Sequence, residues 1–169
     1  MKHLKAIVLD VDGVLTDGGL WWGPNGEEWK RFHFADIMGV SLAKKSGLTV
    51  ALISGEDSPL VDRFATKMGI ADIEKNCKDK AGALRSFASR RGLNLSEICF
   101  MGDDVNDLEA MDIAGLAAAP ASAVSAALKK AAFIATKNGG KGAVRELVDA
   151  ILLAKTAEVE VAIDHAQSF

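Results

Sequence analysis

Short apolar runs alternate along this chain with longer segments in which apolar residues recur at helical spacing. Apolar residues fill each run, which is typical of strands covered on both faces. Such alternation predicts an α/β fold with a doubly wound, Rossmann-like parallel sheet and helices on both of its faces. The predicted strands are Ala6–Leu9, Val50–Ile53, Ile98–Met101, Leu116–Ala119 and Phe133–Ala135. The predicted helices are Asp36–Ser46, Pro59–Met68, Lys80–Arg91, Val105–Met111, Ala123–Lys130 and Ala143–Lys155.

One insertion, at about residues 18–35, breaks this alternation. The pair Asn25–Gly26 predicts a tight hairpin turn. The insertion holds all three tryptophans and two of the seven phenylalanines. An isolated hairpin cannot bury so many rings. It therefore either folds back on the core or packs against another subunit, and the concentration of aromatic residues favours a subunit interface.

Composition narrows the functional classes. We expect the 169 residues, 49% of them apolar, to form a single domain over residues 1–169. The net charge of −3 predicts no general attraction to nucleic acid or to an anionic membrane. Two cysteines suggest reduced thiols rather than a disulfide framework. No signal peptide or membrane span is predicted, so the expected compartment is the cytoplasm.

Acidic residues follow two of the predicted strands. Asp10 and Asp12 come directly after Ala6–Leu9, and residues two apart in extended chain point to the same side. Asp103, Asp104 and Asp107 follow Ile98–Met101. Carboxylates gathered at the carboxyl edge of a sheet repel one another unless a proton or cation lies between them. Such oxygen ligands suit Mg²⁺ rather than zinc, although one of these residues could simply cap the following helix.

Other polar groups predict an anion site at the same edge. Ser54 and Gly55 follow a strand, where a hydroxyl and backbone N–H groups can bind an anion. Lys80 lies in the first turn of a predicted helix, against the helix dipole, which is better explained if an anion lies nearby. The glycine-rich segment Asn138–Gly142 either cradles phosphate or is an ordinary turn.

Together these groups predict phosphoryl chemistry. One carboxylate can attack phosphorus to form an aspartyl phosphate, and another can protonate the leaving alkoxide and then activate water. Lys80 and Mg²⁺ would offset the negative charge that otherwise repels the attacking carboxylate.

The ordered motifs D-x-D-G-V-x-T-D-G, strand–Ser-Gly, Lys and G-D-D-x-x-D resemble those of the haloacid dehalogenase superfamily of phosphohydrolases, over nearly the whole chain. The resemblance implies a fold without a cap domain here, because only the hairpin separates the first strand from the first helix. It also implies the site roles. Asp10 is implied as the nucleophile and Asp12 as the general acid/base. The implied phosphate ligands are Ser54, Gly55 and Lys80. The implied Mg²⁺ ligands are Asp10, the Asp12 carbonyl and Asp103, with Asp104 and Asp107 as supports of the metal site.

Two further motifs narrow the resemblance. Asn-Gly-Glu-Glu-x-Lys-x-Phe in the hairpin and Gly-Gly-x-Gly-Ala-Val-Arg-Glu at Gly139–Glu146 are similar to the 3-deoxy-D-manno-octulosonate 8-phosphate phosphatase family. That similarity implies a homotetramer in which the hairpins meet at the centre and a neighbouring subunit partly covers each active site. The implied substrate is a phosphorylated 2-keto-3-deoxy sugar acid.

Alternatives remain within and beyond this family. Glu56 stands where the octulosonate enzymes commonly have arginine, and Glu56 with Lys67 resembles phosphatases of nine-carbon ulosonate 9-phosphates. Both residues could bind substrate or be solvated surface charges. A receiver-like signalling domain also combines an acidic pocket, Mg²⁺ and a lysine, but the D-x-D and G-D-D spacings favour a hydrolase. A silent scaffold assembled through the hairpin is a third possibility.

Overall fold

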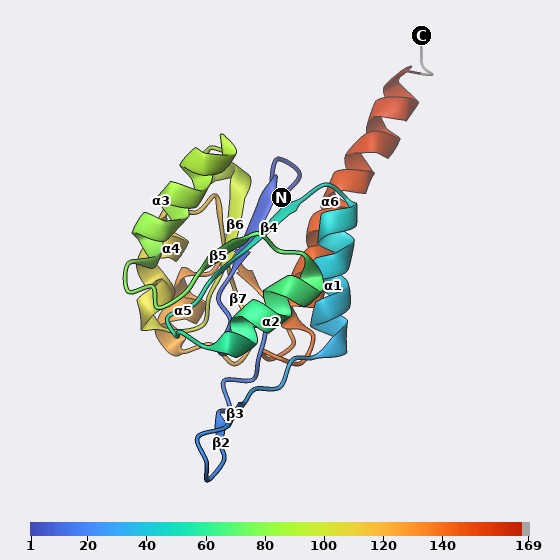
Figure 1. Ribbon diagram of the computed structural model, residues 1–169. Helices are drawn as coiled ribbons and strands as arrows, with labels where there is room; N and C mark the ends of the chain where they lie inside the picture. The colour runs from blue at the N-terminus through green and yellow to red at the C-terminus, as the bar shows by residue number, and fades with distance from the viewer. Residues whose placement is uncertain (167–169) are drawn as a thin grey trace.

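The fold is a twisted six-stranded parallel sheet between two layers of helices (Figure 1). A computed structural model describes residues 1–166 of the chain, with side chains through Thr156. The strands run in the order β5-β4-β1-β6-β7-β8, all in parallel, so β1 lies at the centre. Their bounds are β1 Ala6–Leu9, β4 Thr49–Ile53, β5 Asp72–Glu74, β6 Ile98–Met101, β7 Leu116–Ala119 and β8 Phe133–Ile134.

Each face of the sheet has its own core, as the predicted doubly wound fold requires. Ile7 and Leu9 of β1 belong to the core beneath α1, α2 and α6, whereas Ala6 and Val8 belong to the core beneath α3, α4 and α5. Successive strand residues thus point to opposite faces, and both faces are apolar. The helices are α1 Phe34–Lys45, α2 Pro59–Met68, α3 Lys80–Arg91, α4 Leu108–Ile113, α5 Ser125–Lys130 and α6 Ala143–Ala166, with short 3₁₀ turns η1 Leu95–Glu97 and η2 Val105–Asp107.

Three elements differ from the sequence prediction. The edge strand β5 was not predicted, because it pairs with β4 alone and its polar, half-exposed residues give no apolar run. The segment predicted as one helix from Val105 divides into η2 and α4. The last helix continues past Lys155, since no glycine or proline interrupts it before Ala166.

The insertion between β1 and α1 forms the predicted hairpin and projects away from the sheet (Figure 1). Strands β2 (Trp21–Trp22) and β3 (Glu28–Trp29) pair antiparallel around a turn that contains Gly26. This turn needs glycine at position 26 because the φ angle of Gly26 is +86°. The Trp21 and Trp22 residues are 68% and 76% exposed, so the hairpin leaves its tryptophans uncovered within this chain. No cap domain follows β1.

Two further features concern the cysteines and the helices. Cys77 and Cys99 are both free thiols. Over the part of the chain that the structure describes, no helix has the length and apolar character needed to cross a membrane.

Candidate active site

Most of the predicted site residues gather at the carboxyl ends of three adjacent strands, β4, β1 and β6. Open α/β sheets bind ligands at this edge. A pocket of about 230 Å³ opens here. Its lining residues are Asp10, Asp12, Gly55, Glu56, Asp103, Asp104, Val105 and Asn106.

Lys80 is the cation at the base of this site. It begins α3, and its side chain is only 1% exposed. Its Nζ lies 2.8 Å from Asp10 Oδ1 and 2.6 Å from Asp107 Oδ1. Burial acts to lower the pKa of Lys80, but the two carboxylates outweigh it and raise that pKa. A permanently charged ammonium therefore fixes one oxygen of Asp10.

The carboxylates at this edge carry more negative charge than Lys80 compensates. Burial raises the pKa of Asp10 to about 6 even with Lys80 in contact. Burial, with the nearby charges of Asp10 and Asp107, raises the pKa of Asp103 to about 8. One oxygen from each of Asp10, Asp103 and Asp107 lies within 4.8 Å of the others. Hard oxygen donors in this arrangement fit a divalent cation such as Mg²⁺.

Asp107 also shapes the loop that follows β6. Its Oδ2 accepts hydrogen bonds from the backbone N–H groups of Asp103 at 2.8 Å and Asp104 at 3.2 Å. Both of its oxygens are therefore engaged by protein donors. Asp104 is exposed and accepts a 2.6 Å hydrogen bond from the Val105 N–H. This network holds Asp103 at the mouth of the pocket.

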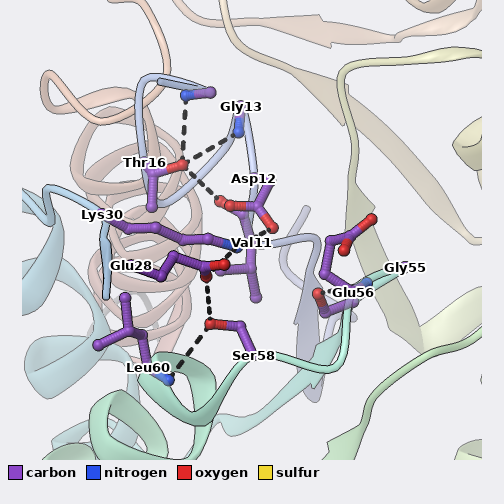
Figure 2. Close-up of polar contacts among 12 residues, drawn as sticks. Val11, Asp12, Gly13, Thr16, Glu28, Lys30, Gly55, Glu56, Ser58 and Leu60 are labelled. Carbon is purple, nitrogen blue, oxygen red and sulfur yellow. Dashed lines mark hydrogen bonds and ion pairs between the residues drawn. The ribbon is translucent and has the colours of Figure 1, made fainter. Parts of the chain in front are cut away.

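The turn after β1 is organised by the buried hydroxyl of Thr16 (Figure 2). Its Oγ1 accepts from the N–H groups of Gly13 at 3.3 Å and Gly18 at 3.2 Å, and it donates to the Val11 carbonyl at 3.4 Å. A Cβ on Gly13 would lie 2.0 Å from Asp103 Oδ2, so only glycine lets the two acidic loops approach. This turn sets the positions of Asp10 and Asp12 relative to Asp103.

The glycine-rich segment Asn138–Gly142 supports that turn and is absent from the pocket lining. A Cβ on Gly139 would lie 1.7 Å from the Gly13 carbonyl oxygen. The Gly140 N–H donates a 3.0 Å hydrogen bond to the Val14 carbonyl. These glycines are explained by close packing of two backbones rather than by phosphate binding.

The remaining predicted residues lie in three different surroundings. Ser54 is buried, and its Oγ accepts a 3.2 Å hydrogen bond from the Glu56 N–H. Glu56 is exposed and lines the first pocket, next to Gly55. Lys67 instead lines a second pocket of about 250 Å³, with its Nζ 5.8 Å from the centre of the Phe34 ring. The structure thus brings Glu56, but not Lys67, into the pocket of Asp10.

Sequence reasoning missed Lys30. Its Nζ lies 2.8 Å from Asp12 Oδ2 and 3.7 Å from Glu28 Oε1 (Figure 2). The Glu-Glu-x-Lys motif singled out the hairpin without placing this lysine beside Asp12. The placement depends on a β-bridge between Thr16 and Phe32, which draws the returning arm of the hairpin against the turn after β1.

Comparisons with known proteins find a matching family and similar enzymes. The family profile of haloacid dehalogenase-like hydrolases matches residues 28–147. The chain is 34% identical to the 3-deoxy-D-manno-octulosonate 8-phosphate phosphatase of Escherichia coli K12, over 91% of this chain and 82% of that one.

Solved structures show the same relationship. One is the 3-deoxy-D-manno-octulosonate 8-phosphate phosphatase from Moraxella catarrhalis, crystallised with a magnesium ion, a phosphate ion and a KDO molecule. Its sequence is 36% identical to this chain, and the two structures superpose with a TM-score of 0.90 over 96% of this chain and 94% of that one. A putative haloacid dehalogenase superfamily hydrolase from Legionella pneumophila is 38% identical with the same TM-score, covering 99% and 92%.

Proposed function

The chain belongs to the haloacid dehalogenase-like hydrolases, and we propose that within this family it is an Mg²⁺-dependent phosphatase of 3-deoxy-D-manno-octulosonate 8-phosphate. The observation that carries the proposal is the buried Asp10–Lys80–Asp107 cluster with Asp103 at the pocket mouth. Similarity to octulosonate phosphatases over most of both chains supplies the substrate class. Membership in a hydrolase family disfavours the receiver-like alternative.

Asp10 and Asp12 divide the chemistry between them in this proposal. Asp10 attacks phosphorus with the oxygen that Lys80 leaves free, and the bond from phosphorus to the sugar oxygen breaks. Asp12 protonates the departing alkoxide, then takes a proton from the water that cleaves the aspartyl phosphate and releases inorganic phosphate. The two carboxylates contact different lysines, Lys80 for Asp10 and Lys30 for Asp12.

The surrounding groups bind the phosphate. Lys80 at the start of α3, with the Ser54 hydroxyl and the Gly55 backbone after β4, would offset the charge on the transferring group. Mg²⁺, held by Asp10, the Asp12 carbonyl and Asp103, would withdraw negative charge from the phosphoryl oxygens. Asp104 and Asp107 keep the loop that follows β6, which carries Asp103, in place through the hydrogen bonds described above.

A nine-carbon ulosonate 9-phosphate is the second candidate substrate. Its support is Glu56, a carboxylate that lines the pocket and can accept hydrogen bonds from sugar hydroxyls. Lys67 lies in the second pocket, whose lining also includes Lys30, the lysine that contacts Asp12. Its proposed role is contact with the substrate carboxylate.

We infer that the hairpins assemble a homotetramer. Large apolar residues on and beside the hairpin are exposed by half or more, an uncommon density for a free surface. These are Trp21, Trp22, Trp29, Phe34 and Met38. The two free thiols fit the reducing cytoplasm as the compartment of the assembled enzyme.

Phosphate release from the eight- and nine-carbon substrates, with Mg²⁺ or with EDTA, tests the proposal. Wild type should cleave one of the two substrates when Mg²⁺ is present and neither of them in EDTA. Asp10→Asn should cleave neither substrate under either condition. Asp149→Asn, on the exposed face of α6 beside Arg145, is the matched control and should retain full activity. Cleavage of a generic aryl phosphate but neither sugar acid would reject the substrate class, and an active Asp10→Asn would reject the mechanism.

A further inference from the structure

We propose that Lys30, which reaches the site from the hairpin, is a positioning residue that orients Asp12 for proton transfer to and from the substrate. The inference rests on the acid/base role proposed for Asp12. It extends the site beyond the motif residues at the strand ends, and it connects the hairpin directly to the chemistry.

The Lys30 ammonium is buried between carboxylates. Its side chain is only 3% exposed, and Nζ lies 2.8 Å from Asp12 Oδ2. A buried lysine needs such partners because an unpaired charge is costly away from water. Lys5, by contrast, pairs with Glu97 while its side chain stays 63% exposed, as is usual for a surface ion pair.

A chain of contacts fixes the ammonium in place (Figure 2). Lys30 Nζ lies 3.7 Å from Glu28 Oε1, and the same Glu28 oxygen accepts a 2.8 Å hydrogen bond from the Ser58 hydroxyl. Ser58 is buried and caps the first turn of α2. The position of Lys30 is therefore set by both the hairpin and α2, which are rigid relative to a free lysine side chain.

This arrangement leaves one oxygen of Asp12 available to substrate. Lys30 engages Oδ2, whereas within the described side chains Oδ1 accepts no hydrogen bond from a protein donor. Asp12 itself lines the pocket and its side chain is 30% exposed. Among the described residues no other donor contacts this carboxylate, so loss of the ammonium would leave it free to rotate toward water. A misdirected acid transfers its proton poorly, because the reaction requires hydrogen-bond distance to the reacting oxygen.

The test is a double-mutant cycle of Lys30→Met and Asp12→Asn, read as kcat/KM. Lys30→Met should lower kcat/KM for octulosonate 8-phosphate by roughly 10²-fold, the lower bound for losing acid–base catalysis. In the Asp12→Asn background the same change should alter kcat/KM by less than about twofold, because Lys30 acts through the carboxylate that is already gone. Lys30→Arg should restore most of the lost activity.

Leaving-group dependence supplies a readout that a merely structural lysine would not change. Cleavage of 4-nitrophenyl phosphate needs little protonation of the leaving group, so Lys30→Met should affect it far less than phenyl phosphate. Lys5→Met is the matched control and should leave the ratio of the two rates unchanged. Lys30→Gln, which keeps a hydrogen-bond donor on a neutral chain, should fall between Lys30→Met and wild type.

Two results would overturn the inference. Equal losses on both aryl phosphates, or full additivity with Asp12→Asn, would assign Lys30 a structural role alone. These results differ from failure of the proposed function, in which wild type would not cleave octulosonate 8-phosphate, and from failure of the acid/base role, in which Asp12→Asn would leave hydrolysis unchanged.

Discussion

Replacing Lys80 with methionine should destabilise the metal-free protein by several kcal/mol. Methionine keeps an unbranched side chain of similar length but removes the ammonium. Asp10 and Asp107 would then lose their shared cation, at sites where their side chains are 7% and 0% exposed. Two buried carboxylates would face each other, and Asp103, without compensation.

The contact distances set the magnitude. At 2.8 Å and 2.6 Å, each ion pair is worth roughly 6 kcal/mol of Coulomb attraction at an effective dielectric constant of about 20. Desolvation of the three charges opposes most of this gain, so removing one partner of such a cluster costs about 3–5 kcal/mol. With a urea dependence of about 2 kcal/mol per molar, the unfolding midpoint should fall by about 2 M.

Urea unfolding in EDTA at neutral pH measures this loss. The deficit should shrink as the pH falls, because protonation of the carboxylates then removes the charge that Lys80 normally balances. Added Mg²⁺ should shrink it as well, because the uncompensated carboxylates of the folded variant would bind the cation more tightly than those of wild type. The exposed pair of Lys5 with Glu97 is the control, and Lys5→Met should cost at most about 1 kcal/mol. A loss below about 1 kcal/mol for Lys80→Met, or one independent of pH, would refute the electrostatic account.

Further perturbations test the metal site, the turn after β1 and the hairpin. Mg²⁺ affinity should weaken as the pH is lowered from about 8 to about 6, because protons then compete with the metal for the carboxylates. Burial and neighbouring carboxylates raise the pKa of Asp103 to about 8, and burial raises the pKa of Asp10 to about 6. Tighter Mg²⁺ binding at the lower pH, measured by titration calorimetry, would contradict this. Gly139→Ala places a methyl group 1.7 Å from the Gly13 carbonyl oxygen and should lower both the melting temperature and kcat, so a variant equal to wild type in both would show that the close packing is unimportant. Trp22→Asp should reduce the sedimentation coefficient from that of a tetramer, and an unchanged coefficient would remove the hairpin from the subunit interface.

Much of the fold could be predicted because its central strands are buried on both faces. Continuous apolar runs marked β1 and β6 to the residue, and apolar residues at helical spacing marked α2 with its observed bounds, Pro59–Met68. The edge strand β5 gave no such signal, since half-exposed strands tolerate charge. Local pattern therefore predicted the strands that contain an apolar run, including the edge strand β8, and missed the edge strand whose residues are mostly polar.

The site divides in the same way. Asp10, Asp103 and Lys80 could be placed together because parallel strands end at one edge of the sheet. Lys30 could not, because its contact with Asp12 depends on the path of the hairpin over eighteen residues rather than on strand register. The position of Lys67 relative to Glu56 likewise depends on packing of α2, and the two residues line different pockets.

The central claim is that Asp10 accepts the phosphoryl group, and its most direct test is to trap the covalent intermediate. A single turnover with Mg²⁺ and substrate, quenched rapidly in acid, should yield a peptide containing Asp10 that is heavier by one phosphoryl group. The same peptide from Asp10→Asn should carry no added mass. Phosphate on a different residue, or full turnover without any phosphorylated peptide, would contradict the assignment of Asp10 as the nucleophile.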